Sequence, residues 1–129
     1  MDNMRMAYLL SLANAKIAAT AAGTEVDLVK SFVSPGKREM KAVSAPIMAT
    51  SDSGGTLAIK LQHSNTTVDS DFSDISGAAF TTVTDNGVAK TPEQIHFFSN
   101  RRYIRCYSTI SDSTTWASSV VLFALKRDM

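Results

Sequence analysis

The side chains with the most reactive chemistry in this chain are two histidines and one cysteine. His63 and His96 are its only histidines, and Cys106 is its only cysteine. A metal ligand or a general base needs carboxylate or thiolate partners at a suitable spacing, and neither histidine has an obvious one. Cys106 stands between Arg105 and Tyr107 in an alternating segment, which favours a small buried side chain over an activated thiolate. We therefore expect no catalytic residue, no cofactor site and no metal ligand, and the chain is not predicted to be an enzyme.

Three carboxylates follow one another closely in the middle of the chain, at Asp69, Asp71 and Asp74. Carboxylate oxygens are the ligands that calcium prefers, but this segment lacks the glycine and the terminal glutamate of an EF-hand loop. The expected structure is a solvated loop, and a weak calcium site is the alternative.

Arginines gather around an aromatic residue near the end of the chain. Arg101, Arg102 and Arg105 flank Tyr103, a composition that also occurs in nucleic-acid-binding surfaces. The chain as a whole has 13 Lys and Arg against 12 Asp and Glu, so it lacks the strong positive field that nucleic-acid binding needs. The arginines are instead predicted to cap a turn and to pair with carboxylates on a neighbouring strand or on a partner subunit.

The elements that position these side chains are predicted from the alternation of apolar and polar residues. In residues 56–64, Leu57, Ile59 and Leu61 fall on one side of an extended chain, while Lys60 and Gln62 fall on the other. This period of two is typical of a strand with one buried face. Comparable segments occur at 25–30, 41–48, 77–84, 94–99 and 103–110, and an apolar run at 120–125 is predicted to be buried on both faces.

These segments, separated by polar turns, predict an all-β fold, a jelly roll or β-sandwich of about eight antiparallel strands. A chain of 129 residues is long enough to bury one core and forms a single body. The predicted core centres on Leu57, Ile59, Leu61, Phe97, Ile104, Ile110, Val121, Phe123 and Leu125.

The first residues are harder to interpret. Residues 8–19 are rich in Ala and Leu, and this composition alone favours a helix. However, the polar residues Ser11, Asn14 and Lys16 do not share a helical face, and no capping residue precedes them. We expect an extended N-terminal arm over 1–22 that leads into a jelly-roll domain over 23–129, with a helical arm as the alternative.

Cellular location is constrained by what the sequence lacks. No run approaches the ~18 consecutive apolar residues of a membrane span, and no clean apolar stretch of a signal peptide follows the N-terminus. A lone cysteine fits synthesis in the cytoplasm. We expect no membrane partner and no nucleic-acid partner.

Two blocks of sequence resemble a known family. The first is residues 10–28, LSLANAKIAATAAGTEVDL, and the second is residues 55–64, GTLAIKLQHS, continued by residues 75–80 and 102–105. They resemble the small head-decoration, or cement, proteins of tailed bacteriophages, of the jelly-roll kind described for a Bordetella phage. The resemblance implies an oligomeric jelly roll without catalytic residues that sits on the outside of a capsid and bridges major capsid subunits.

The same resemblance implies the partners and the location. The partners would be the major capsid protein and further copies of the chain, as a homodimer or a homotrimer, on a virion whose parts are made in the bacterial cytoplasm. The residues predicted to contact the capsid or a neighbouring subunit are Tyr8, Leu9, Leu12, Ile17, Arg101, Arg102 and Arg105. The alternative is a carbohydrate- or receptor-binding β-sandwich of a phage tail or fibre, with Trp116, Tyr103 and Tyr107 as a stacking platform.

Overall fold

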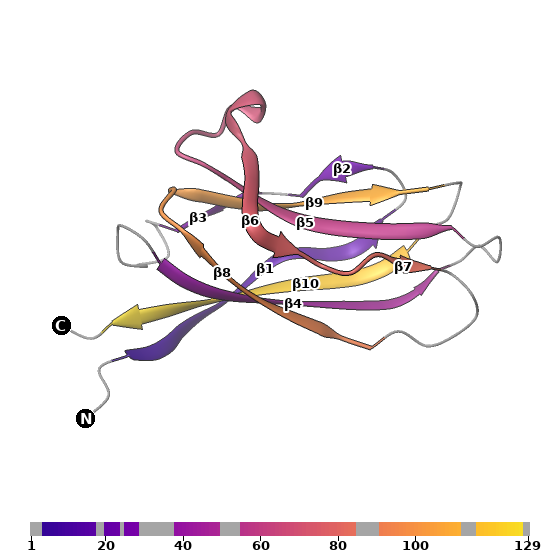
Figure 1. Ribbon diagram of the computed structural model, residues 1–129, viewed down its shortest axis with the longest axis horizontal. Helices are drawn as coiled ribbons and strands as arrows, with labels where there is room; N and C mark the ends of the chain where they lie inside the picture. The colour runs from indigo at the N-terminus through magenta and orange to yellow at the C-terminus, as the bar shows by residue number, and fades with distance from the viewer. Residues whose placement is uncertain are drawn as a thin grey trace.

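The computed structural model describes residues 4–17, 20–23, 25–28, 38–49, 55–84, 91–111 and 116–127. Within these ranges the regular structure is antiparallel β-strand, apart from one short 3₁₀ turn, η1 (Asp69–Asp71). The strands form two sheets that lie one above the other (Figure 1).

The lower sheet in Figure 1, sheet A, contains the three longest of these strands, β1, β4 and β10. Its order is β1-β10-β4-β8. The strands are β1 (Met4–Ile17), β10 (Trp116–Arg127), β4 (Arg38–Ala49) and β8 (Glu93–Ser99).

The upper sheet, sheet B, has the order β2-β9-β5-β6, with β3 paired to β9 and β7 paired to β5. The strands are β2 (Ala21–Ala22), β3 (Val26–Asp27), β5 (Thr56–Ser64), β6 (Ser73–Ala79), β7 (Val83–Thr84) and β9 (Tyr103–Ile110).

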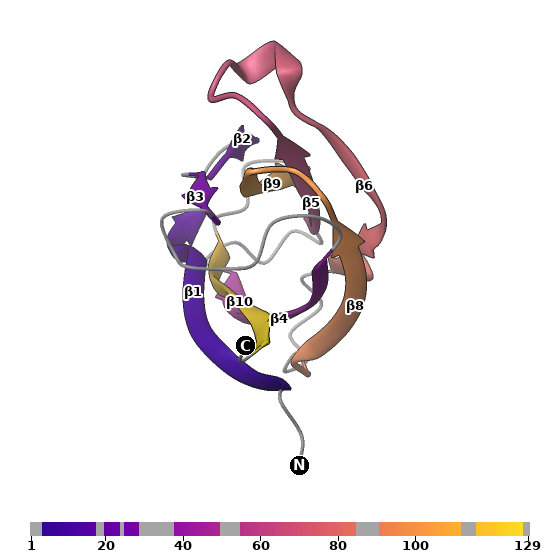
Figure 2. The same cartoon turned by 90° about the vertical axis from the view of Figure 1, so that its left-hand side faces the viewer.

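The strand pairs are nested along the chain. β1 pairs with β10, β2 and β3 pair with β9, β4 pairs with β8, and β5 pairs with β6. One long antiparallel hairpin has therefore been rolled up, so that its successive pairs alternate between the two sheets. This is the jelly-roll topology, and it confirms the predicted fold class. Figure 2, which looks along the roll, shows the two sheets curving around a common interior, with the tip of the hairpin between β5 and β6 projecting from it.

The interior is filled by the apolar side of each strand. Leu57, Ile59 and Leu61 are at most 3% exposed, as the alternation in β5 predicts. Phe97 and Ile104, also predicted, are buried with them, and Ile110 is half-buried against the same cluster. Each such side chain contributes about 1.5–3 kcal/mol through burial. The further buried apolar residues are Leu28, Met40, Ala42, Ile75, Ala78, Phe80, Cys106, Trp116, Val120 and Leu122.

The prediction for β10 was wrong at Val121. Val120 and Leu122 are fully buried, whereas Val121 is only half-buried, so this strand does not bury both of its faces. The reason is that sheet A covers the core with one face only, and β10 alternates like its neighbours. The side chains of Phe123 and Leu125 lie outside the described residues.

The N-terminal segment is extended from Met4 to Ile17, but it is hydrogen-bonded to β10 along this length. Pairing satisfies the backbone groups of the segment, which no short helix could do as stably. The described part of the expected arm therefore forms the first strand of the roll, β1, and then β2, which pairs with β9 in sheet B. The pairing shifts register between Met6 and Tyr8 and between Ser11 and Ala13.

Candidate interaction surface

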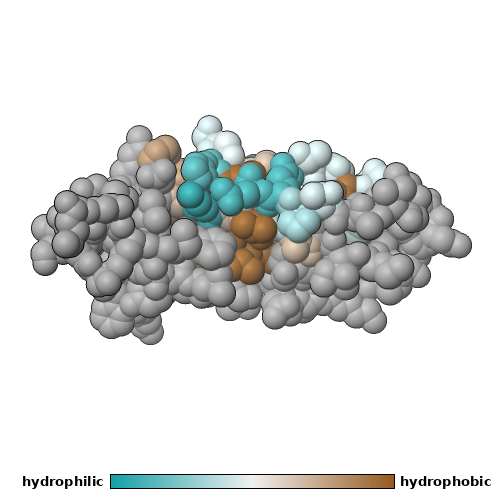
Figure 3. All heavy atoms as spheres, turned by 90° about the horizontal axis from the view of Figure 1, so that it is seen from below, coloured by the Kyte–Doolittle hydropathy of each residue, from teal (hydrophilic) through white to brown (hydrophobic). Residues whose placement is uncertain are grey.

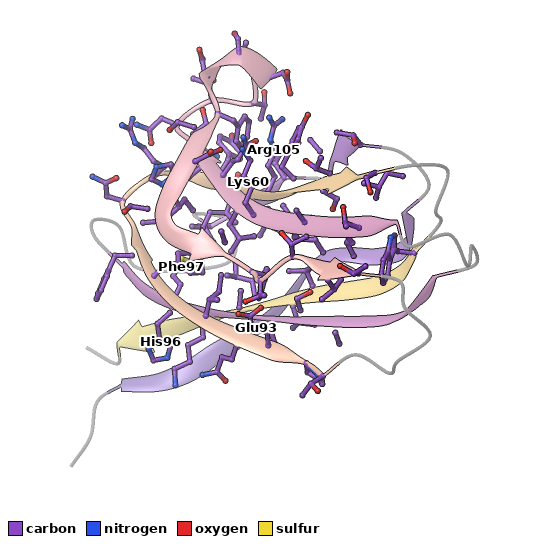
Figure 4. The ribbon with its side chains drawn as sticks, turned by 45° about the vertical axis from the view of Figure 1, so that its right-hand side comes forward. Lys60, Glu93, His96, Phe97 and Arg105 are labelled. Atoms are coloured by element: carbon purple, nitrogen blue, oxygen red, sulfur yellow. The ribbon has the colours of Figure 1, made fainter. Side chains whose placement is uncertain are left out.

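The outer face of sheet B carries a cluster of charged and aromatic side chains. Alternation in β5 turns Lys60 and Gln62 away from the core, and the pairing with β9 places Gln62 opposite Arg105 and Lys60 opposite Tyr107. Figure 4 shows Lys60 and Arg105 together at sheet B, whereas Phe97 lies between the sheets.

Arg105 is the centre of this cluster. Its Nη1 donates to Asp69 Oδ1 at 2.6 Å, and its Nε donates to Gln62 Oε1 at 2.9 Å. Its guanidinium lies 4.1 Å from the centroid of the Phe72 ring. The side chain of Arg105 is only 9% exposed although it stands on the outer face of its sheet, whereas that of Asp69 is 87% exposed. The loop that carries Asp69 and Phe72 is therefore folded back over the guanidinium.

Gln62 connects this arginine to a second ion pair. Its Nε2 donates to Asp74 Oδ1 at 2.9 Å, and Lys60 Nζ donates to Asp74 Oδ2 at 2.9 Å. The hydrogen bonds from Gln62 and Lys60 lower the pKa of Asp74 below its usual value. Lys60 Nζ also lies 5.5 Å from the centroid of the Tyr107 ring. Because this pair is exposed, its contribution to stability is small.

A separate ion pair fixes the turn before β9. Arg102 Nε and Nη2 donate to the two carboxylate oxygens of Asp27 at 3.0 and 2.9 Å. The same guanidinium lies 5.1 Å from the centroid of the Tyr103 ring. The prediction that the arginines pair with carboxylates is confirmed for Arg102, whose partner is on neighbouring β3, and for Arg105. Arg101 is exposed, and its backbone N–H donates to Ser99 Oγ.

The three aspartates do not converge on one point. Asp69 pairs with Arg105, Asp74 with Lys60, and Asp71 accepts a hydrogen bond of 2.6 Å from Thr66 Oγ1. All three carboxylates are exposed. The predicted solvated loop is confirmed for Asp69 and Asp71, but it was wrong for Asp74, which lies in β6 and pairs with Gln62 of β5. Among the described residues, no three His, Cys, Asp or Glu side chains are grouped so that they could hold a metal ion.

The two histidines and the cysteine lie on three different strands, β5, β8 and β9. His63 Nδ1 is 2.8 Å from Ser99 Oγ, and burial, with a smaller effect from Arg101, lowers its pKa. His96 is exposed on β8. Cys106 is buried, as predicted, and burial raises the pKa of its thiol to about 11, so the thiolate is scarce at neutral pH.

The aromatic platform of the alternative interpretation is not formed. Trp116 is 1% exposed and belongs to the core. Tyr103 and Tyr107 do share one face of β9, but both are half-buried and each has a cation close to its ring.

The predicted contact residues fall on both sheets. Tyr8, Leu9 and Ile17 lie on β1 opposite Ala124, Phe123 and Trp116 of β10, and Leu12 falls at a register shift. The arginines lie on sheet B and the turn before it. Contact of either set with another subunit stays a prediction. The structure describes the backbone pairing of β1 but not its side chains.

Two members of the cluster, Gln62 and Phe72, were not identified from the sequence as partners of an arginine, and neither was Asp27, the partner of Arg102 in the separate ion pair. Alternation does place Gln62 on the polar face of β5. Its pairing with Arg105 depends on the register between strands 43 residues apart, and the local sequence carries no signal for it.

The outer face of sheet A differs from that of sheet B. Val43 and Val121 are paired across β4 and β10, and Lys41 is paired with His96 across β4 and β8. Seen from below, Figure 3 shows hydrophobic surface beside hydrophilic residues on this side. Among the side chains of sheet A that the structure describes, Val43 and Val121 are half-buried apolar residues that lie side by side on this face.

A small cavity lies where the roll opens between β8 and β7. Its volume is about 20 Å³, which is enough for one water molecule and too small for an organic substrate. In its lining, Thr81 donates through its N–H and its hydroxyl to the Glu93 carboxylate at 2.7 and 3.0 Å. The lining residues are Ser44, Leu57, Ile59, Phe80, Thr81, Val83, Thr91 and Glu93.

No protein-family model and no curated protein sequence matches the chain. Among solved structures, it is similar to a chain from a structure named Desmodium yellow mottle tymovirus. The identity is 10%, the TM-score is 0.46, and the match covers 92% of this chain and 81% of that one. A likeness of this strength carries no argument about function. No helix in the described part of the chain has the length and apolar composition that crossing a membrane needs.

Proposed function

We propose that this chain is a non-enzymatic structural protein of a phage virion, a cement protein that binds the outside of the capsid and bridges major capsid subunits. Its partners are the major capsid protein and further copies of itself. It has no nucleic-acid or membrane partner, and it joins the head after synthesis in the bacterial cytoplasm.

The observation that supports the proposal is where the sequence resemblance falls in the fold. Residues 10–28 and 55–64, which resemble phage cement proteins, lie on β1, β2, β3 and β5 of a roll with jelly-roll topology. The charged groups of sheet B are engaged with one another, as in the pairs of Arg105 with Asp69 and Lys60 with Asp74. Such an arrangement suits a protein that presents surfaces rather than a reactive group.

The physics of a filled shell gives such a protein its role. DNA inside a shell pushes outward, and a protein that binds only the assembled shell stabilises that state by mass action. Because many copies repeat by symmetry, contacts of modest strength add up through avidity.

The test is electron microscopy of heads from the phage that encodes the chain, with its gene intact or deleted. The expected result is extra density on the outside of intact heads, and earlier rupture of the deleted ones on heating. With near-neutral charge, the chain should stay on heads washed in ~1 M salt, where the Debye length is about 3 Å. Heads that carry no such density, or that are equally stable without the gene, would contradict the proposal.

A further inference from the structure

We propose that the tip loop, residues 65–72 between β5 and β6, is a preformed contact element whose apex at Val68 inserts into a shallow apolar pocket of the shell protein. The inference rests on the proposed function for the identity of the partner. It assigns the contact to a particular part of the chain, which the capsid-binding role alone does not do.

The tip loop is fixed at its base. Arg102 N–H donates to Asn65 Oδ1 at 3.2 Å, which ties the loop to the turn before β9. Thr66 N–H donates to Ser64 Oγ at 3.0 Å, and Val68 N–H donates to Thr66 Oγ1 at 3.2 Å. Short side chains that bond the backbone two residues away hold such a loop in one conformation.

The second half of the loop is held by the 3₁₀ turn and by Arg105. Asp71 N–H donates to Val68 O at 3.0 Å, and Phe72 N–H donates to Asp69 O at 3.3 Å. The Arg105 guanidinium then joins Asp69 by an ion pair and Phe72 by a stacking contact. Removing a guanidinium from water is costly, so these partners must offset that cost. The result is a loop clamped to the sheet.

A clamped loop suits binding because its conformational freedom has already been lost. Association then costs less ordering entropy than it would for a mobile loop. The tip loop is also accessible, since it is the tip of the rolled hairpin and projects beyond sheet B (Figures 1 and 2).

The apex combines one apolar side chain with small polar ones. Val68 is 55% exposed, and its neighbours Thr67 and Ser70 are exposed. A single exposed apolar residue is ordinary on a protein surface, and Phe98 on sheet A is a comparable case at 53%. What distinguishes Val68 is its place on the clamped loop. The matching surface is a shallow apolar pocket bordered by hydrogen-bond donors, with a basic side chain near Asp71.

The experiment measures binding to heads that lack the chain, with purified wild-type protein and three variants. Val68→Ser is expected to raise the half-saturating concentration about tenfold, in line with the loss of one buried aliphatic side chain. Phe98→Ser, matched in exposure but on the other sheet, should change it less than about twofold. Asp69→Ala, which releases the clamp but leaves Val68 in place, should fall between them.

Val68→Ser and Phe98→Ser should unfold within a few degrees of the wild type, because both side chains are exposed. Asp69→Ala leaves the nearly buried Arg105 guanidinium without its carboxylate, so it should unfold at a lower temperature, and its binding is measured well below that transition. Binding of Val68→Ser at the wild-type concentration, or an equal loss in Phe98→Ser, overturns the inference while leaving the proposed function intact. Failure of the wild-type protein to bind these heads overturns both.

Discussion

The two sheets of the roll are stabilised by different means. Sheet A has strands of 14, 12 and 12 residues in β1, β10 and β4, which pair over most of their length. Sheet B has edge strands β2, β3 and β7 of only 2 residues each. Its outer face is instead held by side chains, through the bonds of Arg105, Gln62 and Asp74.

This difference indicates which part of the fold should respond to salt and pH. Backbone ladders and apolar burial respond weakly to salt and pH, whereas ion pairs respond to both. Sheet B, whose described outer face is held by ion pairs, is therefore expected to respond to solvent conditions and to single charge substitutions.

The largest loss of stability should follow from a substitution in the hydrophobic core between the two sheets. Leu61 on β5 is 0% exposed, so Leu61→Ala removes core contacts and leaves a cavity. We expect a loss of about 2–5 kcal/mol in the free energy of unfolding, measured by denaturant titration. Thr109→Ala, at an exposed position of β9, is the control. A loss below about 1 kcal/mol for Leu61→Ala would mean that the core is not closed there.

A smaller effect should follow from breaking the cluster on sheet B. Arg105→Ala removes the charged hydrogen bonds to Asp69 and Gln62 and the contact with Phe72. We expect a loss of about 2 kcal/mol, since Arg105 is nearly buried whereas Asp69 is exposed and rehydrates. Arg105→Lys should recover only part of it, because lysine lacks the planar fork of donors.

The matched control is Lys60→Ala, which breaks the exposed pair with Asp74 on the same face. Its cost should stay below about 1 kcal/mol. Equal losses in the two variants would show that the tip loop does not cover Arg105.

The fold was largely predictable because it depends on local patterns. The alternation of Leu57, Ile59 and Leu61 identifies a strand and its buried face without reference to any partner. The run at 120–125 was misread for a related reason. Its uniformly apolar residues do not say which face is covered, and only the position of β10 in sheet A makes Val121 the outward one.

The sequence predicted that the arginines would pair with carboxylates, but it did not predict which carboxylates these would be. Excess charge near Tyr103 indicated that Arg102 and Arg105 would pair with carboxylates. Their actual partners, Asp27 and Asp69, are 75 and 36 residues away in the chain, and only the rolling of the hairpin brings them together. Phe72 carried no signal at all, since one aromatic residue in a polar loop has no periodicity to follow.

Gly77 offers a smaller test of sheet B that leaves its charges unchanged. Its φ of +77° lies in the left-handed region, and a Cβ added there meets no atom within 4 Å. Gly77→Ala should therefore cost about 1 kcal/mol through backbone strain alone. Ser76→Ala, at the exposed neighbouring position, is the control. An unchanged denaturation midpoint for Gly77→Ala would mean that β6 adopts another backbone conformation.

The smallest expected effect is the dependence of stability on pH that His63 of sheet B contributes. Burial, together with Arg101, lowers the pKa of His63 from 6.5. As the pH falls below about 6.5, the unfolded chain takes up a proton at this position before the folded chain does. The unfolded state then binds more protons, so the free energy of unfolding falls with falling pH until the folded His63 is also protonated. Above about pH 6.5 this contribution to stability is complete.

The measurement is the free energy of unfolding between about pH 7 and pH 5 for the wild type and two variants. His63→Asn retains a hydrogen-bonding group near Ser99 Oγ, the partner of His63 Nδ1, but does not titrate, so the fall should be shallower. Thr109→Ala, at an exposed position of β9 that does not titrate, should leave the fall as it is in the wild type. If His63→Asn and the wild type lost stability in parallel, the acid sensitivity would reside elsewhere, and His63 would not be the group that makes sheet B respond to pH.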